Sequence, residues 1–264
     1  MFNLIVTCVG SKKYEGPTIR DTLTSLQQKG IRDDVNELFE NWKKVIFERI
    51  KSSNYLPKVH DVYKGSMWNA SIEAFEEINE PKQLWIISCG FGLINSEENI
   101  TGYHATFKRG EEDSVYNKYY FPTLGENEVK RQWWNLLIEK GVVKTGHPKS
   151  IHELVNNLGS GDVVMVVAGK DYYEAIFDDL SRIKISEKLP KLAFIGIKRE
   201  DGNYNVRFPK DLYKYIISYS DHAKLRGFLE QEVERCNYTQ VNPKATQFII
   251  KQYNETGELS YTFP

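Results

Sequence analysis

Four polar segments of the sequence carry side chains that could bind an anion, stack on a ring or transfer a proton. They are CVGSKKYEGPTIRD (8–21), SCGFGLINSEENITGYHATF (88–107), AGKDYY (168–173) and KRED (198–201). They begin at or just after the ends of four short and nearly continuous apolar runs, which occupy 3–9, 83–89, 162–168 and 191–197. Such runs are typical of strands covered on both faces. Because open α/β sheets bind ligands beyond the carboxyl ends of their strands, we expect the four segments to form one site.

The first segment has the composition of an anion-binding loop. Gly10 and Ser11 precede Lys12 and Lys13, and together they could cradle a phosphate or a carboxylate. The GxxxxGK[ST] spacing of a P-loop is absent, so the motif does not identify a nucleotide site by itself. A solvated basic turn is the alternative interpretation.

Glycines and aromatic residues dominate the second segment. Gly90 and Gly92 would let the backbone approach a ligand closely. Phe91, Tyr103 and Phe107 could offer ring faces to a nucleobase, and each such contact is worth about 1–3 kcal/mol. The alternative is that these glycines form turns and these rings belong to the core.

Proton transfer and metal binding have few candidates in this sequence. The three cysteines lack CxxC spacing and the five histidines form no HxxxH or HxH pattern, so we expect no disulfide framework and no metal site. Cys89 is interpreted as a small buried apolar residue. His104 is the histidine that falls within a site segment. Asp171 could act as a carboxylate or cap the helix that begins beside it.

Helical patterns between the apolar runs predict the elements that position these segments. Apolar residues recur at three- and four-residue spacing over 35–50. Ser150 with Glu153 predicts a capping box, and Asn242 before Pro243 predicts the N-cap of a last helix. Alternation of strands and helices predicts an α/β fold with a mostly parallel central sheet and helices on both faces. We expect a single domain that includes all 264 residues.

Charge and hydropathy exclude several classes of protein. The 35 basic and 36 acidic residues give a net charge of −1, so no global field attracts a polyanion. The apolar runs are far shorter than the about 20 residues of a membrane helix, and the first residues lack the pattern of a secretory signal. A cytoplasmic protein without a membrane partner is expected.

The segment 198–226 differs from the rest of the chain in its charge. It carries seven basic and four acidic residues, with tyrosines and a phenylalanine between them. This composition is typical of a nucleic-acid groove and also of a solvated face over a core. We expect 198–264 to be a basic, aromatic and helical extension of the domain.

The site segments also resemble a bacterial family of uncharacterised domains. Its pattern is a strand ending in C-G-x-x-K, a Pro followed by A-[RK]-D-L-Y, then S-A-x-x-G-L-[IL], P-Y-D and a small residue with Gly before a Tyr. The matching residues here are Cys8, Gly10, Lys12 or Lys13, Pro17, Arg20, Asp21, Ser88, Gly92, Leu93, Ile94, Tyr103, Ala168, Gly169 and Tyr173. Gly102 replaces the Pro and His104 replaces the Asp of the P-Y-D element.

This family is similar to peroxide-stress proteins of the YaaA type, which bind DNA. It is also similar to the central domain of archaeosine synthases, which acts on a modified base in RNA, and to DNA glycosylases of antiphage defence. The resemblance implies a three-layer fold like that of uracil-DNA glycosylases. It implies a base in nucleic acid as the target. We expect DNA with modified bases, and the sequence leaves the choice between DNA and RNA open.

We therefore expect a DNA glycosylase of antiviral defence that flips a modified base and cleaves its N-glycosidic bond. A DNA-binding stress or defence protein without turnover is the alternative, and a nucleoside or nucleotide enzyme is a third possibility. The expected catalytic residues are Asp21, Asp171 and His104. The expected substrate-binding residues are Cys8, Gly10, Ser11, Lys12, Lys13, Arg20, Ser88, Phe91, Gly92, Tyr103, Lys170 and Tyr173. No cofactor is expected, and the sequence leaves the oligomeric state open.

In this hypothesis each group of residues has a separate role. Asp21 or Asp171 stabilises the cationic sugar and orients water, and His104 donates to the leaving base. Phe91 and Tyr103 form stacking walls, while Lys12, Lys13 and Arg20 hold phosphate.

Overall fold

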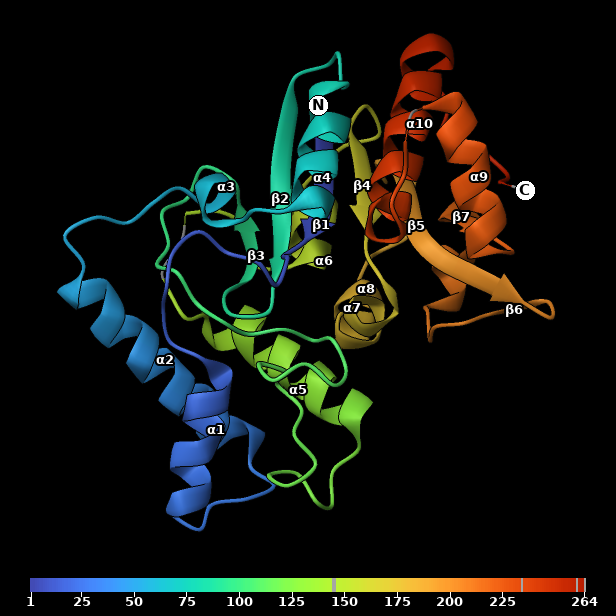
Figure 1. Ribbon diagram of the computed structural model, residues 1–264. Coiled ribbons are helices and arrows are strands. Elements are labelled where there is room, and N and C mark those ends of the chain that lie inside the picture. Colours follow the sequence, from blue (N-terminus) through green and yellow to red (C-terminus); the bar gives the residue numbers. More distant parts are fainter. Residues whose placement is uncertain (144–145, 234, 260, 264) are drawn as a thin grey trace.

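A mixed sheet forms the centre of the molecule (Figure 1). The computed structural model describes residues 1–143, 146–233, 235–259 and 261–263. Within these residues seven strands pair in the order β3-β2-β1-β4-β5-β6, and β7 also pairs with β5. The strands are β1 (Phe2–Thr7), β2 (Lys82–Ser88), β3 (Gly92–Asn95), β4 (Val163–Val167), β5 (Lys191–Glu200), β6 (Asn203–Tyr204) and β7 (Ile216–Tyr219). The four apolar runs are thus confirmed as strands.

The sheet is mostly parallel, as the sequence predicts, but two antiparallel strands make it a mixed sheet. β1, β2, β4, β5 and β7 run parallel, whereas β3 pairs antiparallel with β2 and β6 antiparallel with β5. Both antiparallel strands follow turns that are too short for a parallel crossover. At the second turn Asp201 and Gly202 have φ of 48° and 82°, as a tight Asp-Gly hairpin requires. The expected loop 198–201 is therefore the end of β5 and part of this hairpin.

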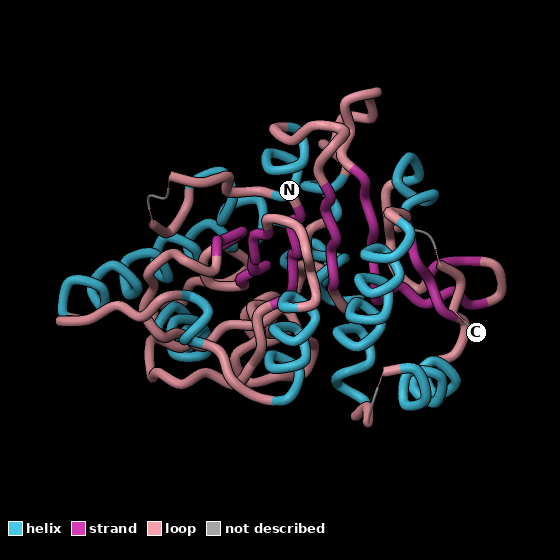
Figure 2. Tube along the Cα trace, turned by 90° about the horizontal axis from the view of Figure 1, so that it is seen from above, coloured by secondary structure: helices cyan, strands magenta, loops and turns pink. Residues whose placement is uncertain are grey.

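Helices lie on both sides of the sheet, as predicted (Figure 2). They are α1 (Ile19–Gln28), α2 (Val35–Ser52), α3 (Val59–Val62), α4 (Ser66–Glu76), α5 (Glu126–Lys140), α6 (Ile151–Asn156), α7 (Lys170–Ala175), α8 (Phe177–Leu180), α9 (His222–Glu232) and α10 (Val241–Thr256), with short 3-10 helices η1 (Lys210–Tyr215) and η2 (Tyr238–Gln240). On one side α10 packs against α4 and contacts β4 and β5. Elsewhere α5 packs against α2, α7 and β3. One apolar cluster extends from Phe2 to Phe263, so the segment 198–264 contributes to the same core.

Local sequence signals explain where two of the helices begin. In α2 the side chain of Asp34 accepts from the backbone N–H of Glu37. Most apolar positions of the predicted stripe are buried, and Val45 and Ile50 are partly buried against the same core. At α6 Ser150 Oγ accepts from the N–H of Glu153, as predicted. Glu153 Oε2 accepts from the N–H of Lys149 and not from Ser150, so the capping box is shifted by one residue.

The start of α10 differs from the prediction. Gln240 is its N-cap, and Asn242 lies within the first turn, so Asn242 does not cap this helix. The capping asparagine is Asn237, which exchanges reciprocal hydrogen bonds with Gln240 at the short helix η2. Because η2 leads directly into α10, the capping signal lies five residues before the Asn-Pro pair.

Two glycines allow the loop after β1 to cross the segment that precedes His104. The backbone N–H of His104 donates to Pro17 O, and the N–H of Ile19 donates to His104 O, each at 2.8 Å. A Cβ on Gly16 would overlap the carbonyl of Gly102, and a Cβ on Gly102 would overlap the carbonyl of Tyr14. Glycine at position 102 is therefore required by the close approach of two backbones.

Gly102→Ala is expected to lower the free energy of unfolding by about 1–3 kcal/mol, because the two loops must separate. Urea denaturation measures this change. Gly227→Ala is the matched control: nothing lies within 4 Å of the added Cβ in α9, and the exchange is expected to raise stability. Equal effects of the two substitutions would contradict the steric explanation.

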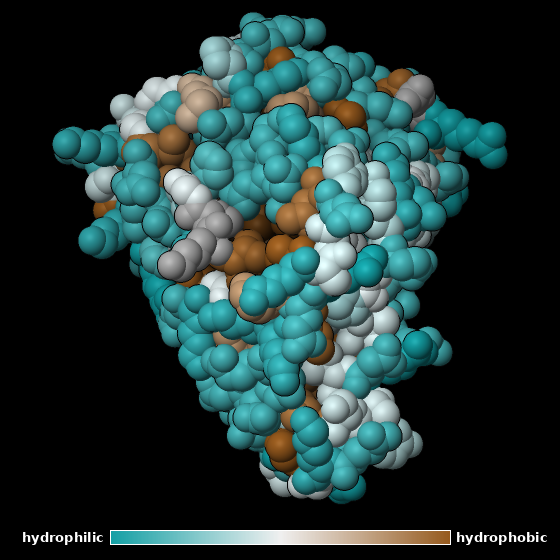
Figure 3. Space-filling model, turned by 90° about the vertical axis from the view of Figure 1, so that its left-hand side faces the viewer, coloured by the Kyte–Doolittle hydropathy of each residue, from teal (hydrophilic) through white to brown (hydrophobic). Residues whose placement is uncertain are grey.

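Hydrophilic side chains dominate the face of the molecule shown in Figure 3, and hydrophobic ones gather in a hollow near its centre. Among the described helices, none combines the length and the apolar composition needed to cross a bilayer.

Candidate functional site

A cavity of about 570 Å³ lies beyond the carboxyl end of β1. Its lining comes from Val9, Gly10, Ser11, Lys12, Lys64, Gly65, Ser66, Met67, His104, Ala105, Thr106, Lys108, Glu111, Glu112, Asp113 and Thr239. These residues belong to the loop after β1, the start of α4, the loop 104–113 and η2. Segments far apart in the sequence thus meet at one edge of the sheet, where open α/β sheets bind ligands.

A smaller cavity of about 150 Å³ lies next to the first, beyond the carboxyl end of β4. Met67, Lys108 and Thr239 line both cavities. The register of the sheet explains the arrangement, because Val6 of β1 pairs with Val167 of β4 and the two strands end side by side. We call the two spaces the larger and the smaller cavity.

Seven of the expected site residues line these cavities. Gly10, Ser11, Lys12 and His104 line the larger cavity, and Cys8, Lys170 and Asp171 line the smaller one. His104 is partly buried, with Nε2 3.5 Å from Glu15 Oε2. Its backbone is fixed by the crossing at Gly16 and Gly102, which holds the imidazole beside the larger cavity.

Asp21, Arg20 and Lys13 lie outside the residues that line the two cavities. The side chain of Asp21 is 73% exposed at the start of α1, so it is not enclosed with a substrate as a catalytic carboxylate would be. Arg20 is also exposed and pairs with Glu112 at 2.6 Å. Lys13 is exposed, and its backbone N–H donates to Val62 O.

Asp21→Asn is expected to change the free energy of unfolding by less than about 0.5 kcal/mol, since the side chain is exposed and distant from the core. Thermal unfolding of the variant beside the unmodified protein measures this. If the free energy of unfolding falls by several kcal/mol, Asp21 stabilises the fold through a stronger interaction than the one with its exposed neighbour Arg20.

Ser88, Phe91, Gly92 and Tyr103 form part of the core behind the larger cavity. Phe91 is 5% exposed and Tyr103 is fully buried, so neither presents a free ring face as a stacking wall. Ser88 Oγ lies 2.8 Å from the Tyr103 hydroxyl and accepts from the N–H groups of Gly90 and Phe91. Gly92 begins β3 with φ of 87°. These residues therefore fit the alternative interpretation of the segment, in which its glycines form turns and its aromatic rings belong to the core.

The Tyr103 hydroxyl also bonds to the Tyr63 hydroxyl at 2.8 Å. Burial raises the pKa of both phenols well above the usual value, so both rings stay neutral. Lys12 Nζ lies 4.4 Å from the centroid of the Tyr103 ring. The role of Tyr103 is therefore to support the lysine at the cavity wall.

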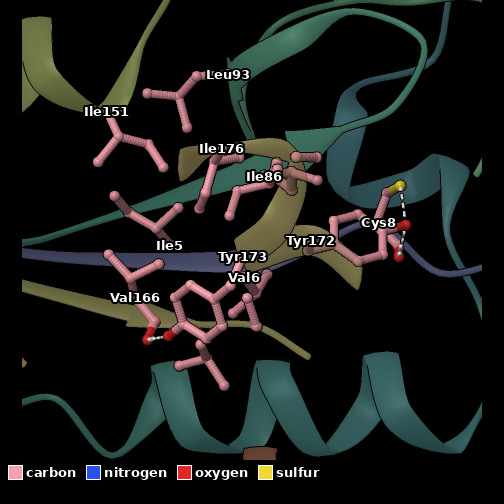
Figure 4. Packing of buried hydrophobic residues seen from close by; sticks show 14 of the residues in the cluster. Ile5, Val6, Cys8, Ile86, Leu93, Ile151, Val166, Tyr172, Tyr173 and Ile176 are labelled. Atoms are coloured by element: carbon pink, nitrogen blue, oxygen red, sulfur yellow. Dashed lines mark hydrogen bonds between the residues drawn. The ribbon is translucent and has the colours of Figure 1, made fainter. Parts of the chain in front are cut away.

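Tyr173 and Cys8 are likewise packed into the core (Figure 4). The Tyr173 hydroxyl lies 3.0 Å from Val166 O and 2.8 Å from Ile195 O, which ties α7 to two strands. Cys8 Sγ lies 3.2 Å from the Tyr172 hydroxyl. Tyr173 is thus a structural residue, and Cys8 is a buried residue at the wall of the smaller cavity.

Asp171 compensates a buried charge. Its Oδ1 lies 2.7 Å from Nζ of Lys130, which is fully buried in α5 and also pairs with Glu126 at 2.7 Å. Gly169 is the N-cap of α7, so Asp171 does not cap this helix. Because the carboxylate is held by Lys130, its position at the smaller cavity is explained without a catalytic role.

Lys12 differs from the other buried lysines of the described chain. Three lysines there are less than 9% exposed, namely Lys12, Lys130 and Lys244. Lys130 and Lys244 each have a carboxylate oxygen within 2.8 Å. Lys12 Nζ donates to Val9 O at 3.1 Å and lies over the Tyr103 ring, and no carboxylate of the described residues comes within 4.0 Å. Burial lowers the pKa of Lys12, which Cys8, Cys89 and Asp113 partly oppose.

Asp113 is a site residue that the sequence did not indicate. Burial raises the pKa of its carboxyl group, and His104, Arg20 and Lys12 act in the opposite direction. Its Oδ1 is buried and has no hydrogen-bond partner among the described residues. The run KRGEED (108–113) has the composition of a solvated loop, so only the fold reveals that its last residue turns inward.

The start of α4 was also missed. Lys64 and Lys108 are exposed at the rim of the larger cavity. Gly65 is the N-cap of α4, with φ of 104°, and no side chain caps this helix. The first N–H groups of α4 are thus free to face an anion at this rim. A glycine between Lys64 and Ser66 was the signal available in the sequence.

Within the part of the chain that the structure describes, no cluster of three or more His, Cys, Asp or Glu side chains could hold a metal ion. Comparisons with protein-family models, with curated proteins and with solved structures gave no match. The geometry of the two cavities is therefore the basis for inferring function.

Proposed function

We propose that the protein hydrolyses the N-glycosidic bond of a modified base in DNA, with the larger cavity as its active site. The observation that carries this proposal is the combination of exposed cations at the rim with a carboxyl of raised pKa at the wall of the same cavity. Perturbed ionisable groups in a cavity are typical of catalytic sites. A uracil-DNA-glycosylase-like fold is part of the proposal, and the arrangement of helices on both faces of a sheet supports it.

Phosphate is assigned to the rim of the larger cavity. Lys64 and Lys108 are exposed there, and the uncapped start of α4 adds backbone N–H groups and the positive end of a helix dipole. Lys12 is buried beneath this rim, so it does not contact phosphate, contrary to the expectation from the sequence. A DNA strand would lie along the rim and turn one nucleotide inward.

The flipped nucleotide is assigned to the cavity itself. A volume of about 570 Å³ falls within the range of small-molecule sites, about 300–1,000 Å³. Met67 and Val9 provide apolar contacts for a base, in place of Phe91 and Tyr103. His104 lines this cavity and is assigned as the donor to the leaving base; its Nε2 lies 3.5 Å from Glu15 Oε2 and has no hydrogen-bond partner among the described residues.

Asp113 takes the role that the sequence assigned to Asp21 or Asp171. An ionised Asp113 in this cavity would stabilise positive charge on the sugar and orient the attacking water. Its buried Oδ1 supports this assignment, because the backbone N–H of Arg20 bonds to the carboxylate while Oδ1 is left as an acceptor without a partner among the described residues. Lys12 and His104 lie near enough to influence its ionisation.

Release of the free base is the direct test of the proposal. The protein is incubated with phage DNA that carries modified bases and with unmodified DNA of the same length, and the released bases are identified by mass spectrometry. We expect release from the modified DNA only, together with strand breaks after alkali. Binding that weakens steeply with salt but releases no base would instead identify a DNA-binding protein without turnover.

A further inference from the structure

Lys12 combines three features that suit an amine nucleophile. It lines the larger cavity, its side chain is nine-tenths buried, and its partners are the carbonyl of Val9 and the ring of Tyr103. Lys130 and Lys244 show how the same fold pairs a buried lysine, with a carboxylate directly on Nζ. Without such a carboxylate, an ammonium is destabilised and the amine becomes reactive.

We infer that the Lys12 amine forms an imine with the C1′ aldehyde of an abasic deoxyribose in the larger cavity, and that the protein thereby cuts DNA at abasic sites. The inference rests on the proposed function, which supplies the class of substrate. Hydrolysis of an N-glycosidic bond leaves an abasic sugar, whose closed form is in equilibrium with this aldehyde. The inference adds a second reaction with its own nucleophile and its own product.

The reaction balances without an oxidant, a reductant or a cofactor. The nitrogen lone pair of Lys12 attacks the C1′ carbonyl carbon, and the amine proton moves to the carbonyl oxygen to give a carbinolamine. Loss of water gives an imine, which is protonated on nitrogen. Asp113 then takes the C2′ proton, and the C3′–O bond breaks so that the phosphate leaves with the bonding electrons. Water hydrolyses the remaining imine and returns the free amine.

Borohydride trapping tests this inference directly. An oligonucleotide with one abasic site is mixed with the full chain and sodium borohydride, which reduces an imine to a stable secondary amine. We expect a covalent protein–DNA complex, and peptide mapping should place the sugar remnant on Lys12. Without borohydride, the abasic strand should be cut before any alkali is added.

Two variants make the test specific to this residue. Lys12→Met should lower trapping at least tenfold, and Lys44→Met, which removes an exposed lysine of α2, should leave trapping unchanged. Thermal unfolding shows whether Lys12→Met is folded. If Lys12→Met is unfolded, the residue that carries the adduct in the unmodified protein tests the inference instead. An adduct on another lysine, or no adduct at all, overturns the inference.

The two proposals fail in different ways. Abasic DNA bypasses base removal, so trapping on Lys12 without base release from modified DNA would support the nucleophile and overturn the hydrolysis of the N-glycosidic bond. Base release without trapping would support that hydrolysis and overturn the role of Lys12.

Discussion

Asp113→Asn is expected to lower the rate of base release at least about 100-fold, the effect seen when one group that stabilises a developing charge is removed. Asparagine keeps the shape of the side chain but cannot carry the negative charge that the sugar cation requires. Initial rates on modified DNA measure the loss. DNA binding should change far less, because Lys64, Lys108 and the start of α4 remain at the rim.

Stability separates this loss of activity from a loss of fold. The raised pKa of Asp113 means that the folded state binds its proton more tightly than the unfolded state does. An ionised Asp113 therefore costs stability above this pKa, and the cost disappears as the pH falls through it. Asp113→Asn removes the cost and should be at least as stable as the unmodified protein at neutral pH.

The pH dependence and a neighbouring variant provide two controls. The rate should fall on the acid side at a higher pH than an ordinary aspartate would give, since ionised Asp113 is the active form. Glu111→Gln removes a negative charge from an exposed residue of the same cavity and should have little effect. Full turnover by Asp113→Asn would remove Asp113 from the mechanism.

Asp179→Ala is expected to lower the free energy of unfolding by about 3–5 kcal/mol, the cost of breaking a buried hydrogen-bonded charge network. Asp179 is fully buried and accepts from Trp134 Nε1, from the N–H groups of Ile151 and His152, and contacts His152 Nδ1 at 2.7 Å. Alanine would leave these donors without their acceptor and open a cavity between α5, α6 and α8.

Urea denaturation of Asp179→Ala and of Asp178→Ala measures this effect with a matched control. Asp178 is the adjacent residue, is partly exposed and accepts one hydrogen bond, from Asn135 Nδ2 at 3.1 Å. Its replacement should cost about 1 kcal/mol or less. Similar losses in the two variants would show that the stability of this region does not depend on the buried network.

The elements of the fold could be predicted where local pattern and burial agree. The continuous apolar runs identify β1, β2, β4 and β5, and the stripe over 35–50 identifies most of α2. Strand order and direction depend on pairing across the whole chain. The antiparallel strands β3 and β6 were missed because both are short and follow tight turns, although the Asp-Gly pair at 201–202 is a hairpin signal.

The candidate site was predictable to a smaller degree. The segments after β1 and β4 could be predicted to lie together, because ligands bind beyond the carboxyl ends of neighbouring parallel strands. Which side chain of a segment faces the cavity depends on tertiary packing. Lys12 is buried while Lys13 is exposed, and Tyr103 lies in the core while His104 lines the cavity. Asp113 belongs to a charged run, and the composition of that run alone predicts side chains exposed to solvent.

The central place of β1 in the sheet has a consequence for synthesis on the ribosome. The first strand to leave the exit tunnel must wait for β2 and β4, with which it pairs on its two sides. α10, from the end of the chain, then covers β4, β5 and α4. A nascent chain that lacks these later segments exposes an unpaired apolar strand, the kind of species that chaperones bind. Folding of this domain should therefore be completed only after α10 has left the ribosome.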